Sequence, residues 1–297
     1  GAGRPRLTLA SPPPLGHTPR SILTSCRHHT GDPSTVNPAP PLLSIEHVTK
    51  RFGGITAVDD CSFALHEGSV TGLIGPNGAG KTTLFNMVAG AFAPTSGRIL
   101  LDGDDVTGLP AHQLFERGLV RTFQIPHEFH RMTCLENLLL VPEGQVGETL
   151  WNAWLRWPRI RGQERRLLER AEEVLEFLNM HHVRDVLAGH LSGGQKKLLE
   201  LGRTMMTDAR LVLLDEPGAG VNKTLLGDIA RSIRTLNQER GYTFCIIEHD
   251  MDLIAALCDP VVVMAEGTVL TQGTMAEIRA NPEVLDAYLG APTETAA

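Results

Sequence analysis

The chain has 297 residues, enough for one large domain or two small ones, and its 42% hydrophobic content is ordinary for a soluble protein. Its formal net charge of −7 argues against a nucleic-acid partner, because such proteins usually present a basic face to phosphates. The five cysteines include no C-x-x-C pair, which favours reduced thiols over a disulfide framework or a zinc site, and no apolar run approaches the roughly 18–20 residues that cross a bilayer.

Residues 1–41 form a leader whose composition differs from that of the rest of the chain. The leader is rich in Pro, Ser and Thr and carries four arginines against one acid, Asp32. Such a segment buries too little apolar surface to offset chain entropy, so we expect it to be disordered. Organelle transit peptides share this composition, but the many prolines oppose the amphipathic helix that such peptides form. We interpret the leader as an extension preceding the domain, and a targeting signal is the alternative.

From Leu42 onward the chain follows regular patterns. Alternating apolar and polar residues predict half-buried strands at 43–48 and 61–65, and an apolar run predicts a strand at 69–74. Residues 84–89 are typical of an amphipathic helix that follows directly.

The loop between this strand and this helix fits the phosphate-binding pattern G-x-x-x-x-G-K-[ST] in the context that the motif requires. Its glycines let backbone N–H groups turn toward phosphate oxygens, and the helix N-terminus adds partial positive charge. Lys81 can reach the β- and γ-phosphates, and the hydroxyl of Thr82 is placed to bind Mg²⁺. The sequence therefore predicts a nucleotide-binding protein. The predicted ATP-binding loop comprises Gly75, Pro76, Asn77, Gly78, Ala79, Gly80, Lys81, Thr82 and Thr83.

A strand at 97–103, a helix at 110–117 with Pro110 in its first turn, and a helical stretch at about 133–182 come next. Three tryptophans at a three-residue spacing share one face of this stretch, either as helix-packing anchors or as a docking surface for a partner. The tryptophans are Trp151, Trp154 and Trp157. A second apolar face comprises Leu167, Leu168, Ala171, Val174, Leu175 and Leu178.

After residue 208 strands and helices alternate, which together with the helical stretch indicates a largely parallel α/β core with a helical insertion. Thr274 and Asn281 are expected to cap the last helices. The predicted strands are 211–215, 244–247, 260–264 and 268–270, and the predicted helices between them are 224–239 and 250–257.

Two adjacent carboxylates end the strand at 211–215, which a continuous apolar run marks as fully buried. At this position Asp215 can hold Mg²⁺ and its waters, as the second acidic element of a phosphate-loop ATPase does. Because successive strand residues point in opposite directions, Glu216 faces away from the metal and is available to polarise a water.

The segment Leu191-Ser192-Gly193-Gly194-Gln195 precedes a helix that Ser192 can cap. Together with the other motifs, it makes residues 42–290 resemble the ATP-binding cassette (ABC) ATPases, whose signature sequence is the same. The resemblance implies an α/β fold, a P-loop NTPase (RecA-like) parallel-sheet core with an antiparallel β subdomain and an inserted α-helical subdomain at about 125–195. Residues 291–297 would then form a flexible tail.

The same resemblance implies roles for three further residues. Gln124 matches the glutamine loop, which contacts the metal and senses the membrane partner. His249 matches the switch histidine that contacts the γ-phosphate, which makes Glu216, His249 and Gln124 the expected catalytic set. Phe52 lies where an aromatic ring stacks on adenine.

Family members form a dimer in which the signature of one subunit completes the ATP site of the other. The single phosphate loop and the single signature, Leu191, Ser192, Gly193, Gly194 and Gln195, therefore imply pairing with a second cassette, either a copy of this chain or a homologue. One departure lies in the loop across that interface, where Asn222 stands in place of the usual Asp and can hydrogen-bond but carries no charge.

The chain resembles the ATP-binding subunits of branched-chain amino acid importers in three segments, 84–86, 121–124 and 284–290. They imply an ATPase with ATP and Mg²⁺ as cofactors, placed peripherally on the cytoplasmic face of the inner membrane. Its implied partners are membrane permease subunits, a second ATPase subunit and, indirectly, an extracytoplasmic solute-binding protein. Import of urea or amides, extraction of lipid or lipopolysaccharide, and a non-transport cassette are the alternatives.

Overall fold

A six-stranded sheet runs through the described structure in the order β10-β9-β3-β8-β7-β6. Neighbouring strands are parallel except at one edge, where β10 runs antiparallel to β9. The structure is a computed structural model that describes residues 40–122, 128–142 and 157–289, all within one unit that starts at Ala39. The strands of this sheet are β3 (Val70–Ile74), β6 (Leu119–Arg121), β7 (Leu211–Asp215), β8 (Thr243–Ile247), β9 (Val261–Ala265) and β10 (Thr268–Gly273).

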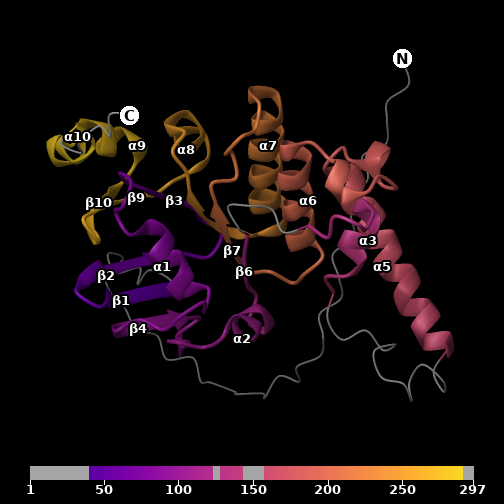
Figure 1. The fold of residues 1–297 in the computed structure, drawn as a ribbon, viewed down its shortest axis with the longest axis horizontal. Coiled ribbons are helices and arrows are strands. Elements are labelled where there is room, and N and C mark those ends of the chain that lie inside the picture. Colours follow the sequence, from indigo (N-terminus) through magenta and orange to yellow (C-terminus); the bar gives the residue numbers. More distant parts are fainter. Residues whose placement is uncertain (1–39, 123–127, 143–156, 290–297) are drawn as a thin grey trace, which may run out of the picture. The chain divides into compact units, whose positions relative to one another are not determined.

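Both faces of this sheet are covered, which explains the continuous apolar runs in its central strands. Alternate residues point to opposite faces, so Leu214 joins a core with the helices α6, α7 and α8, whereas Leu213 joins a core with α1 and the second sheet. Figure 1 shows these two sets of elements on opposite sides of the sheet.

The second sheet is antiparallel, with the order β2-β1-β4-β5. Ile45 pairs with Phe63 on one side and with Ile99 on the other, and this buried face packs against α1. The strands are β1 (Leu43–Phe52), β2 (Ile55–Leu65), β4 (Ser96–Leu101) and β5 (Asp104–Asp105).

Three helices between β6 and β7 pack against one another through Leu138 of α3, Val174 of α5 and Leu198 of α6, all buried. α6 approaches α5 closely at Gly202, where a Cβ would lie 3.1 Å from Val174. The helices of the described structure are α1 (Lys81–Val88), α2 (Ala111–Glu116), α3 (Cys134–Leu139), α5 (Trp157–Phe177), α6 (Gly193–Met205), α7 (Lys223–Arg240), α8 (Met251–Leu257), α9 (Met275–Ala280) and α10 (Pro282–Leu289), with 3-10 turns at His181–Val183 and Ala188–His190.

The parallel core, the antiparallel sheet and the cap at Thr274 agree with the sequence-based predictions. Two predictions for individual residues were wrong. Pro110 precedes α2 as its N-cap and does not lie in the first turn. Leu168 remains 40% exposed, although Ala171, Val174 and Leu175 of the same predicted face are buried.

Several predictions fall outside the described residues. These are the leader, the tail at 291–297, Trp151 and Trp154, whereas Trp157 is described only as the first residue of α5. The helical-subdomain boundary of about 125–195 stays a prediction. In the part of the chain that the structure covers, no helix is long and apolar enough to span a bilayer.

Candidate functional site

The phosphate-binding loop links β3 to α1 and lies close to the backbone of two other strands. Gly75, Gly78 and Gly80 have φ angles of 151°, 79° and 95°, which L residues with a Cβ rarely adopt. A Cβ at Gly75 would lie 2.0 Å from the carbonyl oxygen of Met264 on β9, and one at Gly80 would lie 2.5 Å from that of Ala57 on β2. The loop can therefore adopt this path only with glycine at these positions.

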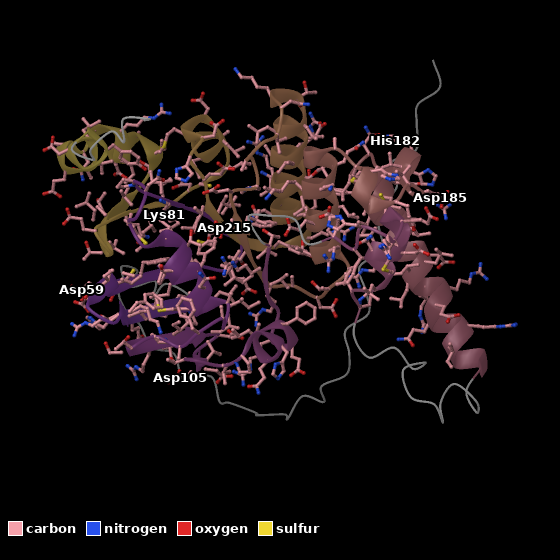
Figure 2. All side chains as sticks on the ribbon, viewed as in Figure 1. Asp59, Lys81, Asp105, His182, Asp185 and Asp215 are labelled. Carbon is pink, nitrogen blue, oxygen red and sulfur yellow. The ribbon has the colours of Figure 1, made fainter. Side chains whose placement is uncertain are left out.

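Lys81 lies inside this loop, with only 6% of its surface exposed. Its Nζ donates to the carbonyl oxygens of Gly75, at 2.7 Å, and Pro76, at 2.9 Å. Burial lowers the pKa of Lys81, and the charges of Glu216 and Asp215 oppose this shift. Figure 2 labels Lys81 on α1 and Asp215 at the end of β7.

The N-terminus of α1 has no side-chain cap. Its first N–H groups, which include those of Thr82 and Thr83, are thus available to an anion, and the helix dipole favours negative charge there. Thr82 is exposed and Thr83 half-buried. Loop, lysine and helix end together form the type of cradle that binds phosphate groups.

Asp215 ends β7 and is 2% exposed. Its Oδ2 accepts a hydrogen bond of 2.9 Å from Arg121 on the adjacent strand β6. Arg121 also donates to the side chain of Asn86 on α1. The sequence analysis used Arg121 and Asn86 only as parts of wider patterns and missed this contact, which depends on β6 and β7 being neighbours.

The oxygens of Thr82 and Asp215 are the hard ligands that Mg²⁺ prefers, and such sites usually combine few protein ligands with phosphates and waters. Within the described ranges no cluster of three or more His, Cys, Asp or Glu residues forms a metal site of its own. The donor set therefore fits a magnesium ion that is carried mainly by a nucleotide.

Glu216 follows β7 directly, and its φ of 50° turns its side chain out of the strand. Its backbone N–H donates to the carbonyl oxygen of Ile247, the last residue of β8. Two residues further, Nε2 of His249 lies 3.1 Å from Oε1 of Glu216. The two predicted catalytic side chains are thus in contact, and both follow the carboxyl ends of neighbouring strands, where α/β proteins bind ligands.

Phe52, the predicted adenine-stacking residue, is 48% exposed. Its ring contacts that of Phe92 edge to face, with the centroids 5.5 Å apart. Lys50 Nζ lies 5.2 Å from the centroid of Phe52. The ring is therefore supported by its neighbours and still offers surface to a stacking partner.

The signature residues form the N-terminal turn of α6. Ser192 and Gln195 make a reciprocal capping box, in which each side chain accepts a hydrogen bond from the other's backbone N–H. Gly194 packs against α7, where a Cβ would lie 1.9 Å from Leu225, whereas Ser192 and Gly193 are exposed. The cap predicted at Ser192 is confirmed, and Ser192 and Gly193 face solvent while Gly194 is buried. Gln124 lies outside the described residues.

Comparison with known protein families identifies the family of this chain. The family model described as "ABC transporter" matches residues 58–219, more than half of the chain, and includes the phosphate loop, the signature and both carboxylates. The chain belongs to the ATP-binding cassette family. Its assignment as an ABC ATPase and its P-loop NTPase fold, predicted above, are confirmed.

Relatives of this cassette place it more narrowly. It is 41% identical over 250 residues to the high-affinity branched-chain amino acid transport ATP-binding protein BraF of Pseudomonas aeruginosa, covering 84% of this chain and 98% of the relative. It is 39% identical to LivG of Escherichia coli, with the same coverage. A second family model, described as "Branched-chain amino acid ATP-binding cassette transporter", matches residues 268–293.

Solved structures agree with this placement. The crystal structure of the ADP conformation of an ATP-binding cassette of an ABC transporter is 36% identical, with a TM-score of 0.72, covering 84% of this chain and 99% of the other. A cassette from Clostridium perfringens, part of the cbiONQ transporter complex, is 28% identical with a TM-score of 0.68, covering 82% and 93%.

Asn222, the departure from the family pattern, has a local role in this cassette. It is the N-cap of α7, and its Oδ1 accepts a hydrogen bond of 2.9 Å from the backbone N–H of Leu225. Asn and Asp cap helices about equally well, so the replacement keeps the start of α7 while it removes one negative charge.

Proposed function

We propose that the chain is the ATP-hydrolysing subunit of a membrane importer for branched-chain amino acids. The observation that carries the proposal is the match of residues 268–293 to the branched-chain family model, which lies outside the motifs that all cassettes share. The identities of about 40% to BraF and LivG support it.

In this proposal ATP binds with its adenine stacked on Phe52 and its phosphates in the cradle of residues 75–83. The backbone N–H groups and Lys81 bind the phosphate oxygens, and the ammonium exchanges its contacts with Gly75 and Pro76 for contacts with the nucleotide. Thr82, Asp215 and Gln124 would hold Mg²⁺. When bound, the ion supplies charge neutralisation on the phosphates.

Hydrolysis is assigned to the pair of Glu216 and His249. Glu216 accepts a proton from the attacking water, and His249, 3.1 Å away, orients that carboxylate and donates toward the γ-phosphate. Gln124 is proposed to contact the metal and to report the state of the permease. The signature residues 191–195 complete the site of a second cassette, and the exposure of Ser192 and Gly193 supports this role.

The proposed complex contains two ATPase subunits and two permease subunits, with the cassette held peripherally at the cytoplasmic face of the inner membrane. An extracytoplasmic solute-binding protein delivers the substrate and does not contact this chain. Closing and opening of the two cassettes around ATP would drive the permease.

The test is uptake of radiolabelled leucine, isoleucine and valine in cells that lack the gene, complemented with the wild-type chain or with Glu216→Gln as a matched control. We expect uptake to fall on deletion and to return with the wild type only. Unchanged uptake of all three amino acids would overturn the importer assignment, and a defect confined to urea, short amides or lipid transport would replace it with that function.

A further inference from the structure

A buried carboxylate outside the predicted site connects two of its loops. Glu248 lies between β8 and His249 and is only 5% exposed. Its Oε1 accepts from the backbone N–H of Gly218 at 2.5 Å. Its Oε2 accepts from the backbone N–H of His249 at 2.9 Å and, more weakly, from that of Asp250 at 3.4 Å. The two oxygens thus bind the backbone of two different segments.

Gly218 lies in the loop that leads from Glu216 to Asn222. The side chain of Glu248 packs directly against Gly218. A Cβ at Gly218 would lie 2.7 Å from Oε1 of Glu248 and 2.9 Å from Leu226. A side chain at this position would have to displace the end of the Glu248 or Leu226 side chain, so glycine lets the carboxylate reach the backbone N–H.

Glu248 is surrounded by hydrogen-bond donors and lies near a buried cation. Three backbone N–H groups compensate the cost of removing it from water. Lys197 of α6 is also buried, and the charge of Glu248 is among those that raise its pKa against the lowering effect of burial. Each carboxylate oxygen of Glu248 is therefore held by the backbone of a different segment.

We propose that Glu248 is a positioning residue that couples the loop 218–222 to the switch His249. The inference rests on the proposed function, in which this loop lies at the interface with the second cassette. Glu248 touches no substrate in this scheme. Because one rigid, planar group binds both segments, a shift of the loop upon dimer closure moves the backbone of His249 and with it the ring that contacts Glu216.

The test is ATP turnover of the full chain carrying Glu248→Gln. The amide keeps the shape but places an NH₂ group against a backbone N–H on one side, so one of the two links is lost. We expect kcat to fall about 10- to 100-fold, as for a misplaced catalytic group, with KM for ATP within about twofold of wild type. Glu277→Gln is the control, since that carboxylate also binds a backbone N–H, but at α9.

A double-mutant cycle with Gly218→Ala separates coupling from simple destabilisation. Gly218→Ala breaks the same contact from the other side, so we expect a similar loss of kcat and a double variant no slower than the slower single one. If Glu248→Gln does not fold, Gly218→Ala carries the test alone. A lowered unfolding midpoint with kcat unchanged, or effects of the two changes that multiply, would overturn the proposal.

Hydrogen exchange gives a readout that needs no turnover, and it separates this proposal from the proposed function. In the wild type we expect MgATP to protect peptides 216–222 and 247–251 together. In Glu248→Gln only one of the two should gain protection. Equal protection of both peptides in the variant would contradict the coupling, whereas a wild-type chain that does not bind MgATP would count against the proposed function.

Discussion

At the scale of single residues, the phosphate loop positions Lys81 through hydrogen bonds to the loop's own backbone. The ammonium of Lys81 is bound by the carbonyl oxygens of Gly75 and Pro76, so it needs no external anion to remain inside the loop. Its lowered pKa, caused by burial, means that the charged form gains when phosphate oxygens arrive as additional partners.

Lys81→Ala should therefore weaken nucleotide binding itself. A hydrogen bond to a charged group contributes about 1.5–3 kcal/mol, so we expect the Kd for ATP to rise about 10- to 100-fold. Titration with a fluorescent ATP analogue measures this. Arg165→Ala, which removes an exposed cation on α5, is the matched control and should leave the Kd unchanged. Equal affinity in Lys81→Ala and the control would contradict the assigned role of the loop.

At the scale of elements, the same capping box begins α3, α6 and α9 in the described part of the chain, and α6 and α9 have different tasks. Ser192 caps α6 within the signature, and Thr274 caps α9 near the C-terminal end, each with a partner three residues later. The geometry is the same, so the contribution to stability should be similar, while only Ser192 lies in a turn that we assign to a second cassette.

Ser192→Ala and Thr274→Ala form a matched pair for this reason. Each should lower the free energy of unfolding by about 1 kcal/mol, which urea titration followed by circular dichroism measures. Only Ser192→Ala should also lower ATP turnover, because its hydroxyl is expected to serve the opposite site. A similar loss of turnover in both variants would show that the signature acts through stability alone.

At the scale of the whole molecule, the proposed function requires a second signature, from another copy of this chain or from a homologue. In Glu216→Gln the amide cannot accept the proton of the attacking water, so we expect turnover to fall at least about 100-fold while MgATP still binds. Mass photometry or light scattering should then show a dimer with MgATP and a monomer without it. A persistent monomer that binds ATP would instead indicate an obligatory heterodimer, and turnover equal to the wild type would remove Glu216 as the base.

Much of this molecule follows from local sequence patterns. The phosphate loop, the acidic end of β7 and the cap at Ser192 each depend on a few neighbouring residues, so their geometry could be predicted. Arg121 and Glu248 could not, because their partners lie on other strands and loops, and the strand order β8-β7-β6 is not encoded at any single position. Leu168 was predicted to share a buried face but is exposed, because helical periodicity shows which residues lie on one face and not which of them other parts of the chain cover.

The contact between Arg121 and Asp215 balances the charges of two buried side chains. Asp215 is only 2% exposed, and an unpaired carboxylate in the protein interior would be energetically costly. Arg121 pairs with Asp215 and also donates a hydrogen bond to Asn86 on α1. The chain thus supplies the counter-charge of Asp215 from its own sheet and ties it to the helix that begins at the phosphate loop.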